Sequence, residues 1–167
     1  MRVFPLIAIL PLTACDLTAG GWAPPETPVP TPAGLIDASD PQALTDIVAR
    51  RGTGFWRRDG LRDPVIRAET AGQSWRVEFY GCSNGSNCTD LRFVAEFPSS
   101  EDELIEPDRI ADWNTNQRFG KASIDEEGAA VLEMNLILAG GVTRQNFDLT
   151  LDWWLLALNQ FQAEFAD

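Results

Sequence analysis

Two segments of alternating apolar and polar residues, separated by a short turn-rich stretch, place the strongest constraint on the fold. Residues 75–80 and 91–97 each turn every second side chain to one apolar face, which is the pattern of a half-buried β-strand. Between them, Cys82 and Cys88 flank the stretch SNGSN. The pattern therefore predicts an antiparallel hairpin with one face toward a hydrophobic core.

A disulfide between Cys82 and Cys88 would set the register of this hairpin. In that register, apolar side chains face one another across the strands, and Glu78 faces the oppositely charged Arg92. A slip by one residue would turn the apolar side chains to the polar face. The disulfide and the apolar pattern therefore specify the same register independently. The predicted apolar pairs are Phe79 with Leu91 and Val77 with Phe93.

Segments on both sides of the hairpin complete an α+β domain. Three segments have apolar residues at helical spacing, and four further segments alternate as strands do. The predicted order is α-β-β-β-β-α-β-β-α, an antiparallel sheet with helices packed against it. The predicted helices lie within residues 39–52, 106–120 and 143–165, and the additional strands lie within residues 55–58, 65–68 and 122–138.

The final helix, which begins after a cap at Thr143, is apolar on two sides. Leu149, Trp153 and Leu156 lie nearly opposite the side that is expected to pack on the sheet. Such a second stripe is either covered by the second helix or the linker, or forms a dimer or protein interface. The residues expected to pack on the sheet are Phe147, Leu151, Trp154, Leu158, Phe161 and Phe165.

The second helix offers a smaller candidate binding surface. Asn114 and Arg118 are four residues apart, beside Trp113 and Phe119. An arginine framed by aromatic side chains is typical of protein recognition sites. The same group could equally attach the helix to the edge of the sheet, and its aromatics could instead form a small-ligand or lipid site.

Residues 1–14 have the pattern of a bacterial export signal. Arg2 precedes an apolar run, residues 3–12, that is too short to span a bilayer. The run ends in LTAC, which resembles the bacterial lipobox, where the cysteine is acylated and becomes the first mature residue. We therefore expect lipid on Cys15, with a secreted protein and an uncleaved anchor as the alternatives.

Residues 15–34 are rich in proline and are expected to form an extended tether. The tether would join Cys15 to a folded domain at residues 35–167. These features predict a membrane-anchored lipoprotein of the cell envelope that faces the periplasm. Acylation of Cys15 would leave Cys82 and Cys88 free to pair, which an oxidising compartment permits.

The composition excludes several classes of function. The chain has no histidine, which removes Ser-His-Asp and Cys-His catalysis and every metal site that uses histidine. Its 13 basic and 25 acidic residues give a net charge of −12, which argues against a nucleic-acid partner. We expect no metal and no cofactor.

No residue is assigned a catalytic role. Residues 81–85 fit the G-x-S-x-G pattern, but a nucleophile elbow needs a strand-to-helix turn and a histidine partner. The acidic clusters at 101–103 and 125–127 are expected to be solvated loops. Two carboxylates that face one another across a cleft would instead indicate a hydrolase.

Four stretches together resemble the YbjN family of bacterial proteins, which are described as sensory transduction regulators. They are LIDASDPQAL, EFYGCSNGSNCTDLRF, IADWNTNQRFGKASIDEEGAAVLEMNLIL and GGVTRQNFDLTLDWW, and they fall within residues 35–158. The resemblance implies an α+β fold similar to type III secretion chaperones, a fold that typically dimerises and binds protein segments. It implies no enzyme activity, cofactor or catalytic residue.

The leading hypothesis is a non-catalytic, lipid-anchored envelope protein with a regulatory role. It would bind a protein or peptide partner and could form a homodimer. The competing hypotheses are a carboxylate-dependent envelope hydrolase and a small-ligand or lipid-binding module.

Overall fold

A six-stranded antiparallel sheet organises the chain in the computed structural model, which describes residues 33–99 and 104–166. The observed order of helices and strands confirms the predicted α+β class. The last turn of the predicted first helix forms a short 3-10 helix. The elements are α1 (Pro41–Val48), η1 (Ala49–Arg51), β1 (Thr53–Arg58), β2 (Pro64–Thr70), β3 (Gln73–Tyr80), β4 (Asp90–Phe97), α2 (Pro107–Asn116), β5 (Lys121–Ile124), β6 (Ala130–Ile137) and α3 (Arg144–Phe165).

The strands lie in the order β1-β2-β3-β4-β6-β5, so that β5 and β1 form the two edges. After β4 the chain passes through α2, enters the sheet at its far edge as β5, and returns as β6 beside β4. The predicted register of β3 and β4 is confirmed, and Glu78 lies opposite Arg92. The predicted apolar pairs, Phe79 with Leu91 and Val77 with Phe93, are also observed.

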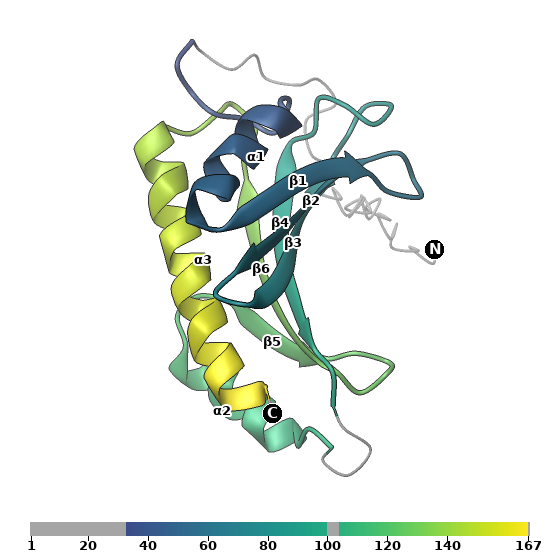
Figure 1. Ribbon diagram of the computed structural model, residues 1–167, viewed down its shortest axis with the longest axis vertical. Coiled ribbons are helices and arrows are strands. Elements are labelled where there is room, and N and C mark those ends of the chain that lie inside the picture. The colour runs from purple at the N-terminus through teal and green to yellow at the C-terminus, as the bar shows by residue number, and fades with distance from the viewer. Residues whose placement is uncertain (1–32, 100–103, 167) are drawn as a thin grey trace, which may run out of the picture.

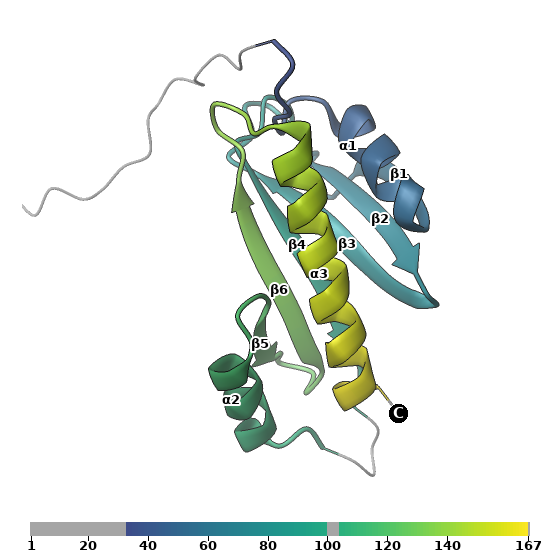
Figure 2. The same ribbon diagram turned by 90° about the vertical axis from the view of Figure 1, so that its left-hand side faces the viewer.

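The long helix α3 lies across the middle of one face of the sheet (Figure 2), with α1 beside it against β1 and β2. Trp154 of α3 is fully buried, and its ring centre lies 5.9 Å from that of Trp75 and 5.6 Å from that of Phe93. The predicted core side of α3 is confirmed, because all six of its residues are buried. They are Phe147, Leu151, Trp154, Leu158, Phe161 and Phe165.

The start of α1 follows from its sequence. The carboxylate of Asp40 accepts hydrogen bonds from the first free backbone N–H groups of the helix, and Pro41 occupies the first turn. The chain turns into β1 at Gly52, where a Cβ would lie 2.1 Å from the carbonyl oxygen of Glu69. Glycine is therefore required at this crossing for steric reasons.

The second helix is shorter than predicted. It ends at Asn116, and Gln117 is already extended, so residues 117–120 connect the helix to β5. The indole N–H of Trp113 donates to the carbonyl oxygen of Gly120, which holds the connection against the helix. This tertiary hydrogen bond ends the helix before the glycine that the sequence pattern had suggested as its stop.

On the face of β4 that points away from α3, one residue differs from the predicted alternation of buried and exposed side chains. Val94 points away from α3, yet it is only 2% exposed. Its cross-strand neighbours on this face are Arg76 and Glu133. The long side chains around Val94 form ion pairs with one another. The apolar stems of such side chains bury neighbouring apolar surface, which accounts for the low exposure of Val94.

Truncation of the central aromatic core is expected to destabilise the protein strongly. Phe93→Ala removes a fully buried ring beside Trp154 and should lower the free energy of unfolding by about 3–5 kcal/mol, because it leaves a cavity. Phe55→Ala is the matched control, because Phe55 is 58% exposed, and its effect should stay within about 0.5 kcal/mol. Urea unfolding followed by tryptophan fluorescence measures both, and equal losses would contradict the assigned core.

Candidate protein-binding surface

Three apolar side chains form an exposed stripe along the outer side of α3. Leu149 is 53% exposed, and Trp153 and Leu156 are each 46% exposed. Their spacing along the helix places them on one face, away from the side that packs on the sheet. Neither α2 nor any other described element buries this stripe, which leaves it available to a partner.

Two residues of the α2–β5 connection extend this stripe. The ring of Phe119 lies 4.8 Å from the ring of Trp153, and the guanidinium of Arg118 lies 5.2 Å from the centre of the Phe119 ring. The structure thus brings together two groups that the sequence had suggested separately. We call the five residues the α3 surface: Arg118, Phe119, Leu149, Trp153 and Leu156.

Trp113 and Asn114 have structural positions instead. Trp113 is only 2% exposed, and its ring meets that of Phe161 edge-on at 4.8 Å. The side-chain amide of Asn114 donates to the carbonyl oxygen of Ala122 and accepts from its N–H. Because α2 ends at Asn116, the expectation that Arg118 lies on the same helix as Asn114 is wrong. Of the four candidate residues near the second helix, Arg118 and Phe119 therefore remain candidates for binding.

Charged side chains beside the stripe are already paired within the chain. Arg51 of η1 contacts Asp148 at 3.1 Å and Asp152 at 2.8 Å, and Arg144 contacts Asp148 at 2.7 Å. The hydrogen bond from Arg144, joined by that from Arg51, lowers the pKa of Asp148. These acidic groups alternate along α3 with Leu149 and Trp153, so the margin of the stripe is polar but locally neutralised.

The opposite face of the sheet carries a network centred on Glu78. Its carboxylate accepts hydrogen bonds from Arg76 at 2.7 Å, from Arg92 at 2.6 Å and from the hydroxyl of Tyr80 at 2.8 Å. Burial would raise the pKa of Glu78, but the hydrogen bonds from the two guanidinium groups outweigh it and lower the pKa. A carboxylate held ionised in this way is unsuited to act as a general acid near neutral pH.

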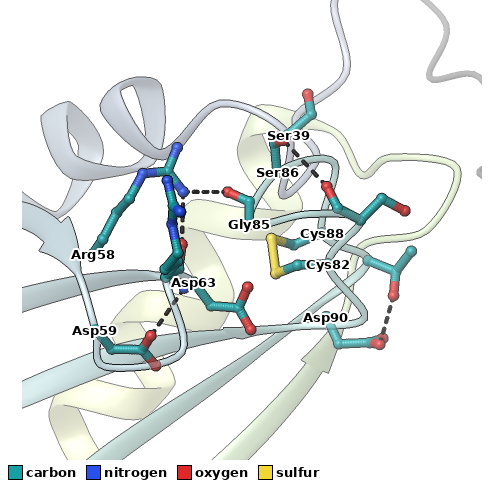
Figure 3. Close-up of a disulfide and its surroundings, with 12 residues drawn as sticks. Ser39, Arg58, Asp59, Asp63, Cys82, Gly85, Ser86, Cys88 and Asp90 are labelled. Carbon is teal, nitrogen blue, oxygen red and sulfur yellow. Dashed lines mark hydrogen bonds between the residues drawn. A yellow bond between two sulfur atoms is a disulfide. The ribbon is translucent and has the colours of Figure 1, made fainter.

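The stretch that fits G-x-S-x-G forms the turn between β3 and β4. A disulfide joins Cys82 to Cys88 across this turn (Figure 3). The side chain of Arg58 donates to the carbonyl oxygen of Gly85 at 2.6 Å and fastens the turn to the β1–β2 loop (Figure 3). Ser83 therefore lies in a hairpin turn and not at a strand-to-helix elbow, as expected from the sequence.

The remaining acidic candidates show no assembled centre in the described residues. The Asp125 side chain accepts from the N–H groups of Glu127 and Ala129, and so it stabilises its own turn. Within residues 33–99 and 104–166, no three metal-binding side chains lie close enough to hold an ion. The cluster 101–103 lies outside the described residues.

The predicted lipid site and most of the predicted tether also lie outside the described residues, Cys15 included. Among the helices that the structure describes, none combines the length and the apolar character that a membrane-spanning segment needs.

Comparison with known proteins identifies one family. The YbjN family profile, described as "Putative bacterial sensory transduction regulator", matches residues 40–167. A crystal structure of "YbjN, a putative transcription regulator from E. coli" is similar to this chain, with a TM-score of 0.50 and 12% sequence identity. The similarity covers 78% of this chain and 96% of that chain and concerns the fold. No curated protein matches the chain.

The Glu78 network is expected to make stability depend on pH. Glu78→Gln should lower the free energy of unfolding by about 1–2 kcal/mol at pH 7, because it removes the charge that two guanidinium groups share. The pKa of Glu78 in the folded chain lies below its ordinary value of 4.5, so its contribution is present above that value and is lost as pH falls through the folded-state pKa. The difference between wild type and variant should therefore shrink as the pH falls below that ordinary value.

Urea unfolding across a pH series measures this difference. Glu69→Gln is the control, because Glu69 is an exposed carboxylate on the same face. A Glu78→Gln effect that is unchanged at low pH, or matched by the control, would contradict the assignment.

Proposed function

The chain belongs to the YbjN family, and on that premise we propose that it is a non-catalytic regulatory protein that binds a protein partner at the cell envelope, anchored by lipid on Cys15. The family description supports the regulatory role, and the leader with its LTAC stretch supports the anchor. The α3 surface carries the binding proposal, because its aromatic and aliphatic side chains are exposed on a helix whose other side is fully buried.

We propose that the protein partner bound at the α3 surface is a second copy of the chain. A helix stripe can meet its own copy about a two-fold axis, which is the commonest symmetry of soluble homo-oligomers. Asp148 and Asp152 flank the stripe, and Arg51 pairs with both. Two copies can therefore approach without bringing unpaired carboxylates together, a repulsion that a chain with a net charge of −12 would otherwise meet.

The disulfide adds support for the envelope location. Two of the three cysteines pair within the domain, as Cys82 with Cys88, which leaves Cys15 as the third. Disulfides persist in oxidising compartments such as the periplasm. An acylated Cys15 would account for the remaining thiol without an exposed free cysteine.

Truncation within the α3 surface should weaken self-association. Trp153→Ala removes the largest exposed side chain of the surface and should raise the dimer dissociation constant at least about tenfold, as for an interface hot spot. Sedimentation velocity on the full chain in detergent measures the change, with Ile137→Ala as a control at a 69% exposed residue of β6. A wild-type chain that stays monomeric at high concentration would contradict self-association.

Lipid attachment is tested on the native product. Mass spectrometry of protein extracted from bacterial membranes should find residues 1–14 removed and the mature chain beginning with an acylated Cys15. Cys15→Ser should release the chain from the membrane fraction, whereas Cys82→Ser should leave it there. An unmodified Cys15, or a membrane-free chain that keeps Met1, would overturn the anchor.

A further inference from the structure

The two edges of the sheet differ in whether their outward-facing backbone groups have hydrogen-bond partners. At the β5 edge, the side chain of Asn114 satisfies both the N–H and the carbonyl oxygen of Ala122, at 2.8 and 3.0 Å. Helix α2 therefore supplies the partner that a neighbouring strand would otherwise supply. This edge is closed to another strand at its centre.

The β1 edge has no comparable cover. Thr53–Arg58 pairs with β2 on one side, and no backbone hydrogen bond joins its other side to any residue that the structure describes. Figure 1 shows β1 on the near side of the sheet with no other element in front of it. An edge of this kind can accept an added strand from another chain.

The side chains beside this edge combine an aromatic ring with positive charge. Phe55 is 58% exposed on the face of the sheet away from α3. Arg67 lies directly opposite it on β2, and Arg57 follows it by two residues on the same face. On the other face, the indole of Trp56 donates to Gln42, which holds β1 against α1. Strand β1 is therefore held to α1 on the face that α3 covers, and its side chains on the other face are exposed.

Positive charge is concentrated here in an otherwise acidic chain. Residues 50–67 contain six arginines and two aspartates, a net charge of +4. The rest of the chain, with 7 basic and 23 acidic residues, has a net charge of −16. This segment, which ends before Glu69 of β2, is thus opposite in sign to the rest of the chain.

Most of these arginines are not neutralised by the chain. Arg51 pairs with Asp148 and Asp152, and Arg58 donates to the carbonyl oxygens of Arg62 and Gly85. The other four are exposed and form no ion pair with a described residue. They are Arg50, Arg57, Arg62 and Arg67.

We propose that the β1 edge binds an acidic peptide segment of a partner protein, which adds to the sheet as an extended strand. The free backbone groups of β1 would pair with the peptide backbone, and the arginines would select acidic side chains. A second copy of the chain is the poorer occupant, because pairing β1 with β1 would bring two sets of unpaired arginines together. The proposal concerns a surface distinct from the α3 surface and does not depend on it.

The test uses the full chain in detergent and three fluorescent ten-residue peptides. A peptide of alternating glutamate and valine should bind, with an affinity that falls as salt rises. A lysine–valine peptide should not bind, because its charge has the same sign as the arginines. A glutamate–proline peptide keeps the acidic charge but lacks the N–H donors at every second residue, and should bind at least about tenfold more weakly.

Charge reversal at the edge supplies the matched variants. The double variant Arg57→Glu with Arg67→Glu should bind the glutamate–valine peptide at least about tenfold more weakly than wild type. Lys121→Glu is the control, because it reverses an exposed charge at the opposite edge strand and should leave the affinity unchanged. Circular dichroism and thermal unfolding establish that each variant is folded.

Four outcomes would overturn the proposal. They are no binding of the glutamate–valine peptide at low salt, equal binding of the glutamate–proline peptide, an equal loss in Lys121→Glu, and self-association that the double variant abolishes while Trp153→Ala does not. The last outcome would assign the edge to a second copy. Dimerisation through the α3 surface is read separately by sedimentation, so it can fail while this proposal stands.

Discussion

The packing of Trp154 against the sheet is the interaction on which the rest of the structure depends. Its ring contacts Trp75 on β3 and Phe93 on β4 and fixes α3 across the middle of the sheet. The indole N–H of Trp154 has no hydrogen-bond partner among the described residues, at a cost of about 1–3 kcal/mol. Full burial of the ring offsets that cost. Once α3 is fixed in this orientation, Leu149, Trp153 and Leu156 must face outward.

The two faces of the sheet are stabilised by different kinds of interaction. The face under α3 is an aromatic and aliphatic core, whereas the other face is held by charged side chains. On that second face, Glu78 binds both Arg76 and Arg92, and the surrounding ion pairs cover Val94. The arginines at the centre of this face are ion-paired, whereas Arg57 and Arg67 at its β1–β2 end have no ion-pair partner among the described residues. The charge of the surface is thus uneven because the fold places carboxylates beside some arginines and not beside others.

Local patterns were sufficient to predict the hairpin but not the end of α2. The register of β3 and β4 follows from a period of two residues and the positions of two cysteines, both of which are readable along the chain. The end of α2 depends on Trp113 and Asn114, whose partners, Gly120 and Ala122, become identifiable only when β5 is in place. Helical spacing alone therefore extended the helix too far.

The candidate surface was predictable in part for the same reason. The apolar stripe of α3 is a periodic feature and could be read from the sequence, including its exposed side. The contact of Phe119 with Trp153 joins residues far apart in the chain, and no local pattern indicates it. The role of β1 as an open edge likewise depends on the order of strands, which places β1 outermost.

The unequal edges also bear on aggregation. A sheet with two open edges can recruit one copy after another and grow into a fibril. Here the side chain of Asn114 occupies the backbone groups at the centre of the β5 edge. A strand can therefore add to β1, but no further strand can add at β5. Stacking through this sheet is therefore self-terminating, and the chain can carry an exposed edge strand without polymerising.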